Sequence, residues 1–237
     1  MENLNSIETL IKSNNVEGKN RWYPQSVNTY KYSIKMDENT SEIKRMNSNF
    51  AYSMQYLEYI EKQIDELIVP SVIRTMLYKS YIITGMGIIE LIFVYLLKKN
   101  GEWNQTEWIE YGDLKSNSKI LNGETIKVET KLYKKVDKYD MRMDLDSMIK
   151  KIEKKHILSI NHEIFPVLKI LRQLRNRVHL QEGTGAYDHD YNKIGLQEMQ
   201  TMRRILYTIL TVSEICRNRQ AFNFIDESYK KCEELCK

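Results

Sequence analysis

Apolar residues recur every three to four positions along most of this 237-residue chain, which is the spacing of amphipathic helices. The pattern predicts a first long helix over 40–66 and a second over 71–99. Pro70 stands where the second helix begins, a position at which its missing N–H does no harm. The dipeptide Asn100-Gly101 is a typical helix stop. Two long helices are therefore expected to form the centre of the fold.

The second half of the chain repeats the helical pattern in shorter segments. We expect helices over 143–155, 163–179 and 196–217, and a final, more polar helix over 222–236. A polar loop over 181–195 separates the second of these from the third. Short connections between amphipathic helices favour antiparallel packing.

Between the two groups of helices the period changes from three or four to two. Asn122-Gly123 is a strong turn signal, and residues 126–132 alternate between apolar and polar. The sequence predicts a small hairpin or an irregular insertion over 102–140. The expected fold is all-α: an antiparallel helical bundle over 40–237 that carries this insertion, preceded by a polar N-terminal arm over 1–39.

Composition limits the classes of function. Hydrophobic residues make up 42% of the chain and charged residues 29%, so the chain is foldable and soluble. The net charge of +4 permits nucleic acid as a partner without requiring it. Three cysteines do not suggest a disulfide framework. Cys232 and Cys236 are interpreted as reduced thiols, with half of a metal site as the alternative. No motif predicts a cofactor or a metal.

The apolar run over 81–97 raises the possibility of a membrane span. It is slightly short for one, and it contains Glu90. We interpret it as a buried core helix, with a transmembrane helix as the alternative. No signal peptide is evident at the N-terminus, so the expectation is a cytoplasmic protein without membrane contact. A buried Glu90 needs a cation, and the arginines of the 171–180 segment are the candidates.

The segment over 171–180 concentrates groups that can bind and cleave a phosphodiester. Four of its polar residues recur at helical spacing and are expected to share one helix face: Arg172, Arg175, Asn176 and His179. Guanidinium groups can hold a phosphate, and an imidazole can transfer a proton near neutral pH. The alternative interpretation is a solvated basic helix face. No carboxylate lies within the segment to neutralise it.

These residues resemble the hallmark of the HEPN domains of bacteria, an arginine followed after four to six residues by a histidine late in a bundle helix. Six residues separate Arg172 from His179, while Arg175-Asn176 supplies the arginine–asparagine dipeptide typical of the family. Only three residues separate Arg175 from His179, which departs from the usual spacing. Either arginine therefore remains a candidate for the catalytic one.

The resemblance implies a metal-independent endoribonuclease that leaves a 2′,3′-cyclic phosphate, within a toxin–antitoxin or phage-defence system. It implies that His179 is the general acid or base, that Arg175 with Arg172 stabilises the scissile phosphate, and that Asn176 orients the histidine or the phosphate. It also implies RNA as the substrate, a homodimer with a composite active site, and an antitoxin or defence protein as a further partner. The alternative is a non-catalytic module of the same fold that binds RNA or protein.

Overall fold

A computed structural model describes residues 22–115 and 117–235 of the chain, with side chains as far as Lys230. The first 21 residues of the predicted N-terminal arm lie outside this part. So does Cys236, and of Cys232 only the backbone is described. The alternative of a metal site at these two cysteines therefore lies beyond the described side chains.

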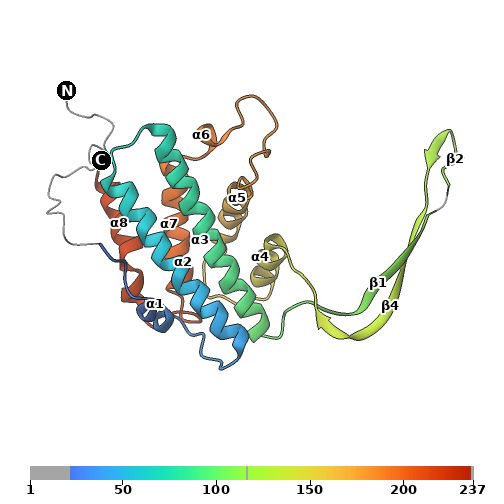
Figure 1. Cartoon of the computed structure of the whole chain (residues 1–237), viewed down its shortest axis with the longest axis horizontal. Helices are drawn as coiled ribbons and strands as arrows, with labels where there is room; N and C mark the ends of the chain where they lie inside the picture. Colours follow the sequence, from blue (N-terminus) through green and yellow to red (C-terminus); the bar gives the residue numbers. More distant parts are fainter. Residues whose placement is uncertain (1–21, 116, 236–237) are drawn as a thin grey trace.

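The two long helices form as the apolar spacing predicts. Helix α2 covers Ser41–Glu66 and α3 covers Ser71–Lys99. The hydroxyl of Thr40 caps α2 by accepting a hydrogen bond of 3.2 Å from the N–H of Ile43. Asn100 caps the C-terminal end of α3, and Gly101 then takes the left-handed conformation with φ of +68°. Figure 1 shows the two helices side by side, in cyan and green.

Helix α3 is the centre of the hydrophobic core. Helices α2, α4, α5 and α7 all pack against it. Within the described residues, α3 is the one helix long and apolar enough to cross a membrane, and 61% of its most apolar stretch is buried inside the protein. This burial is consistent with a soluble protein and with the interpretation of 81–97 as core.

Shorter helices complete the bundle. Their bounds are α1 Val27–Ser33, α4 Leu145–Lys154, α5 Ile164–Asn176, α6 Asp190–Lys193, α7 Leu196–Leu210 and α8 Asn223–Leu235, with a 3-10 turn at Arg219–Phe222 before α8. Helix α1 packs on α2 and buries Tyr30 completely. Helix α7 stops seven residues before the predicted end, because the chain turns back and Cys216 forms a β-bridge with Ile34.

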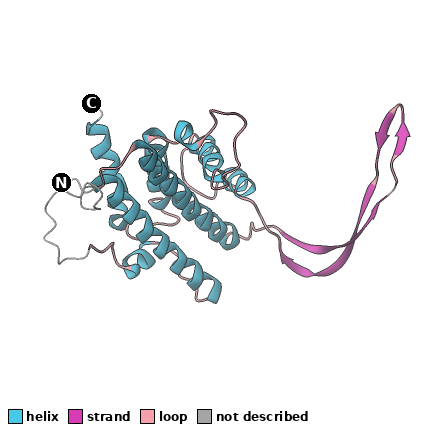
Figure 2. Ribbon diagram, turned by 45° about the horizontal axis from the view of Figure 1, so that its top comes forward, coloured by secondary structure: helices cyan, strands magenta, loops and turns pink. Residues whose placement is uncertain are grey.

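Of the two expected forms of the 102–140 insertion, the structure has the hairpin, and it is long. Strand β1 (Gln105–Lys115) pairs antiparallel with β4 (Glu129–Asp140), and the short strands β2 (Lys119–Leu121) and β3 (Glu124–Ile126) form its tip. Asn122 and Gly123 both have positive φ and make the predicted turn. Figures 1 and 2 show the hairpin projecting away from the helices.

The prediction of an all-α fold is wrong. The structure is 56% helix and 15% strand, a mixed α/β architecture in which a helical bundle carries two separate two-stranded sheets. Register shifts interrupt the β1–β4 pairing between Thr106 and Trp108 and between Glu110 and Gly112. These irregularities break the period of two, which is why the strand over 105–115 is hard to recognise in the sequence.

One ion pair lies inside the core and joins α2 to α7. The Nε of Arg203 donates to Glu61 Oε1 at 2.8 Å, and a second guanidinium nitrogen donates to the other carboxylate oxygen. Glu61 is 4% exposed and Arg203 is 2% exposed. Burial acts to lower the pKa of Arg203, but the bonds to Glu61 outweigh burial and raise that pKa. The guanidinium therefore stays charged within the core.

Candidate functional site

The predicted site residues lie at the C-terminal end of α5. Leu168 and Leu171 bury the core face of this helix. The helix ends at Asn176, and the backbone N–H groups of residues 177–179 then bond to the carbonyls three residues earlier, each at 3.1 Å. His179 is thus exposed in a tight turn beyond the helix. The prediction that it continues the helix face of the arginines is wrong, and the neighbouring Val178 is 48% exposed.

Arg175 pairs with Glu90 of α3. A terminal guanidinium nitrogen of Arg175 lies 2.8 Å from Glu90 Oε2, with the two side chains about a third exposed. The expectation that an arginine of this segment neutralises Glu90 is confirmed. A guanidinium has five N–H donors, and this contact uses one of them. Arg175 therefore keeps donors for a further anion.

Arg172 pairs with Asp146 of α4, at 3.1 Å from a terminal guanidinium nitrogen. Its Nε is buried, with no hydrogen-bond partner among the described residues. A hydrogen bond from Lys150 and the charge of Arg172 together lower the pKa of Asp146. Carboxylates distant in sequence therefore balance the positive charge of both arginines.

Arg177 anchors the loop that follows the site. Its guanidinium donates to Asp190 Oδ1 at 3.0 Å, to Asp188 Oδ1 at 3.1 Å and to the carbonyl of Asp188 at 2.7 Å. Buried Lys79 of α3 donates to the other oxygen of Asp190 at 2.7 Å. The Arg177 side chain is only 12% exposed, although the sequence alone suggests an ordinary surface charge at this position. This network of four residues fixes α6 and the preceding loop to α3 and α5.

The network predicts acid sensitivity of the loop. A backbone hydrogen bond from Thr184 and the charge of Arg177 lower the pKa of Asp188. Burial acts to raise the pKa of Asp190, but bonds from Lys79 and Arg177 outweigh it and lower that pKa. Both folded pKa values thus lie below the unfolded value of about 3.9. The stabilisation is complete above that value and is lost as the pH falls through the folded pKa values.

We therefore expect hydrogen exchange in residues 181–195 to accelerate as the pH falls from 4.5 towards 2.5, after correction for intrinsic exchange. Arg177→Met removes the main cation that holds the loop, so its loop exchanges faster at pH 6 and depends less on pH. Lys150→Met also removes a cation, but one that pairs with Asp146 of α4 and not with the loop, and it serves as the matched control. Equal loop protection in wild type and Arg177→Met would contradict the role of this network.

Asn176 and His179 make no side-chain hydrogen bond to any residue in the described part of the chain. The predicted orienting bond from Asn176 to the histidine is therefore not made in this structure. What the site offers is an exposed imidazole one turn beyond two half-buried guanidinium groups. The two guanidinium groups can bind an anion, and the imidazole can exchange a proton with it. For both to act on one anion, the anion must reach from the end of α5 to the turn that carries His179.

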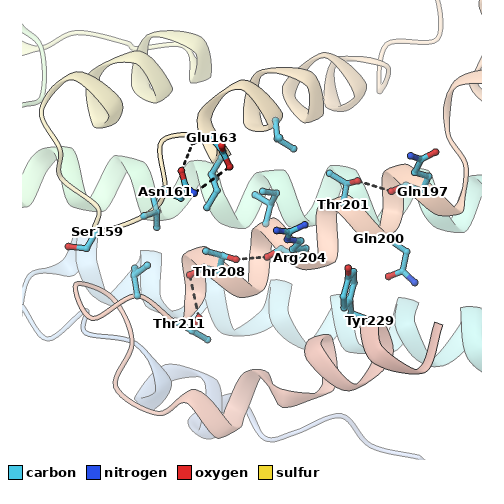
Figure 3. A pocket seen from close by; sticks show the side chains of 15 residues that line it. Ser159, Asn161, Glu163, Gln197, Gln200, Thr201, Arg204, Thr208, Thr211 and Tyr229 are labelled. Atoms are coloured by element: carbon cyan, nitrogen blue, oxygen red, sulfur yellow. Dashed lines mark hydrogen bonds between the residues drawn. The ribbon is translucent and has the colours of Figure 1, made fainter. Parts of the chain in front are cut away.

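A separate cavity of about 830 Å³ lies between α5, α7 and α8 (Figure 3). Its walls carry amide and hydroxyl groups, with Glu163 and Arg204 as the charged residues. The hydroxyls of Thr201, Thr208 and Thr211 donate to carbonyls of their own helix. None of the four predicted site residues lines this cavity. Its lining side chains include no histidine or cysteine, and Glu163 is the carboxylate among them.

Among the described residues, no group of three or more His, Cys, Asp or Glu side chains is arranged to hold a metal ion. Comparison of the chain with models of protein families, with characterised proteins and with solved structures finds no match. The family resemblance therefore depends on the residues of the α5 site alone.

Proposed function

We propose that this protein is a HEPN-type endoribonuclease that cleaves RNA without a metal ion, acting as a toxin or an anti-phage effector. One observation carries the proposal: exposed His179 stands directly beyond the end of the helix that presents Arg172 and Arg175. Exposure leaves the imidazole accessible to a large substrate. The ion pairs to Asp146 and Glu90 restrict both arginines, which favours electrostatic preorganisation.

In the proposed reaction, the imidazole of His179 accepts the proton of an RNA 2′-hydroxyl, whose oxygen attacks the adjacent phosphorus. The bond from phosphorus to the 5′-oxygen breaks, and that oxygen takes up a proton. The products are a 2′,3′-cyclic phosphate and a 5′-hydroxyl. Arg175, assisted by Arg172, stabilises the charge on the phosphate oxygens. Asn176 is assigned to the phosphate, because it follows Arg172 by four residues and so shares a helix face with that arginine.

A homodimer with a composite site is part of the proposal, because separate histidines can then act as acid and base. Facing arginines repel one another. In this chain Asp146 and Glu90 balance the two arginines, which reduces that repulsion. An antitoxin or another defence protein that restrains the enzyme is a further proposed partner.

The second candidate function is a non-catalytic module that binds RNA or protein. The same two ion pairs favour it, because they reduce the net positive charge of the site. Arg175 and His179 also lack the usual HEPN spacing. Under this function the site binds phosphates, with an affinity that decreases steeply with salt, and no turnover occurs.

The two candidates separate in one experiment. Purified protein is incubated with total cellular RNA and with transfer RNA in the presence of a chelator, and binding is measured in parallel at 50 and 200 mM salt. We expect cleavage into discrete fragments. Salt-dependent binding with intact RNA would instead establish the non-catalytic function, and neither binding nor cleavage would contradict both.

A further inference from the structure

A second cavity, of about 440 Å³, lies at the N-terminal end of α3. One wall is formed by the first two turns of this helix, which contribute Ser71, Arg74 and Thr75. The other wall is formed by Tyr191 of α6 and the residues that follow it. The hydroxyls of Ser71 and Tyr191 lie 3.2 Å apart and join the two walls. Figure 1 shows α6 beside the beginning of α3.

The beginning of α3 carries backbone donors that the protein leaves unused. Pro70 stands at the cap position and has no side-chain group that can accept a hydrogen bond. The first bond of the helix runs from the N–H of Arg74 to the carbonyl of Pro70, at 3.0 Å. The N–H groups of residues 71–73 precede it and find no acceptor in the described part of the chain. Free N–H groups at the positive end of a 29-residue helix favour an anion.

Arg74 adds a full positive charge to the same wall. It forms no ion pair with any residue that the structure describes. Among the described residues that line the cavity, none carries a carboxylate. Two carboxylates nearby are already bonded: Asp190 of α6 to Lys79 and Arg177, and Glu198 to a backbone N–H of the α6–α7 connection at 2.9 Å. The cavity therefore holds a cation that no carboxylate balances.

Thr75 supplies a hydroxyl that is almost completely buried. The residue is 7% exposed, and its side chain makes no hydrogen bond to the described part of the protein. The threonines of α7 differ, since Thr201, Thr208 and Thr211 each donate to a carbonyl of their own helix. Buried polar groups without a partner are rare in native proteins. Because Thr75 lines the cavity, a ligand bound there can supply the missing hydrogen bond.

We propose that this cavity binds a phosphate group. The free N–H groups of α3, the guanidinium of Arg74 and the hydroxyl of Thr75 donate to the phosphate oxygens. A phosphate has more oxygen acceptors for these donors than the two of a carboxylate. The volume lies within the usual range of small-molecule sites. The chemistry is the same for a phosphate of an RNA strand and for a free phosphate or mononucleotide, so the site does not depend on the ribonuclease proposal.

The first test is hydrogen exchange of the backbone over residues 69–75 in the full chain, with inorganic phosphate compared against chloride at equal ionic strength. Phosphate should slow this exchange in wild type, and its concentration dependence gives a dissociation constant. Arg74→Met and Thr75→Val should each raise that constant by about tenfold or more, because each loses a hydrogen bond to a charged ligand. Without phosphate, Thr75→Val should unfold at the temperature of wild type, since its hydroxyl has no partner to lose.

Arg45→Met is the matched control. Arg45 is an exposed arginine of α2 that likewise makes no ion pair with a described residue. Its substitution removes the same charge without touching the cavity, so protection by phosphate should equal that of wild type.

A second measurement identifies the source of the phosphate. The RNA is an oligonucleotide with methylated 2′-hydroxyls, which cannot be cleaved by 2′-hydroxyl attack, and its binding is followed over a series of salt concentrations. If the phosphate belongs to a strand, Arg74→Met should reduce the slope of log affinity against log salt by about 0.7, and Arg45→Met should not. An unchanged slope with lost protection by inorganic phosphate assigns the site to a free phosphate or mononucleotide.

Two results would overturn the proposal. One is protection by phosphate that persists unchanged in both Arg74→Met and Thr75→Val. The other is a wild type that phosphate does not protect, together with a salt slope that Arg74→Met leaves unchanged. Neither measurement requires cleavage, so a failure of the ribonuclease proposal is distinguishable from a failure of this one.

Discussion

His179→Ala should slow RNA cleavage by about 10²–10⁴-fold, the usual contribution of a general acid or base. The thermal midpoint of unfolding should stay within about 1 °C of wild type, because surface substitutions without packing or bonding losses change stability little. The His179 side chain is exposed and has no hydrogen bond to the described part of the protein. Single-turnover cleavage of a labelled RNA gives the rate, and calorimetry gives the midpoint.

His189→Ala is the matched control for this measurement. His189 is also an exposed histidine near α5, and its ring nitrogen lies 3.3 Å from the side chain of Asn192. Cleavage by this variant should equal that of wild type. If His179→Ala cleaves as fast as wild type, the imidazole at that position is not the acid or base of the reaction.

The largest loss of stability is expected at the buried ion pair. Arg203→Met leaves the carboxylate of Glu61 uncompensated in the core, and such a change typically costs about 3–5 kcal/mol of the free energy of unfolding. Native domains have about 5–15 kcal/mol in total, so the variant should be close to unfolding at 37 °C. Urea denaturation followed by circular dichroism measures the difference.

The double variant Glu61→Leu with Arg203→Met separates loss of the pair from loss of packing. Replacing both members of a buried pair with apolar side chains of similar size is often neutral or stabilising. We therefore expect the double variant to recover most of the stability lost by Arg203→Met. A single variant as stable as wild type would show that the pair contributes nothing, and an additive double variant would show that the two side chains act independently.

The features that the sequence predicts best are local in the chain. Thr40, Pro70 and Asn100-Gly101 mark the limits of α2 and α3 because caps and stops depend on neighbouring residues. Asn122-Gly123 marks the tip of the hairpin for the same reason. The bulged strand β1 does not follow a simple alternation. The sequence consequently predicts an all-α fold, although it shows the turn and part of β4.

The surroundings of the site depend on contacts between distant segments. The sequence predicts that Glu90 pairs with an arginine of the 171–180 segment, because a carboxylate in an apolar helix must find a cation, but only the structure identifies Arg175 as that arginine. Asp146 and Asp188 sit in polar segments, where nothing in the sequence distinguishes them from solvated surface charges. Their pairing with Arg172 and Arg177 follows from the packing of α4 and the path of the loop.

The end of α5 was the most consequential difference between sequence and structure. Helical spacing continues through His179 in the sequence, but tight turns begin after Asn176. Where the helix gives way to these turns, the hydrogen bonds of Arg177 to Asp188 and Asp190 hold the following loop against the helix end. The imidazole consequently lies in an exposed turn beyond the helix rather than on the helix face.

The chemical ends of the cleavage products test the central claim most directly. A synthetic RNA is cut in the presence of a chelator, and the fragments are analysed by mass spectrometry. Attack by the 2′-hydroxyl predicts a 2′,3′-cyclic phosphate with a 5′-hydroxyl, and no cleavage where a single 2′-deoxynucleotide replaces the scissile residue. Fragments with 3′-hydroxyl and 5′-phosphate ends, or cleavage at the deoxy position, would contradict it.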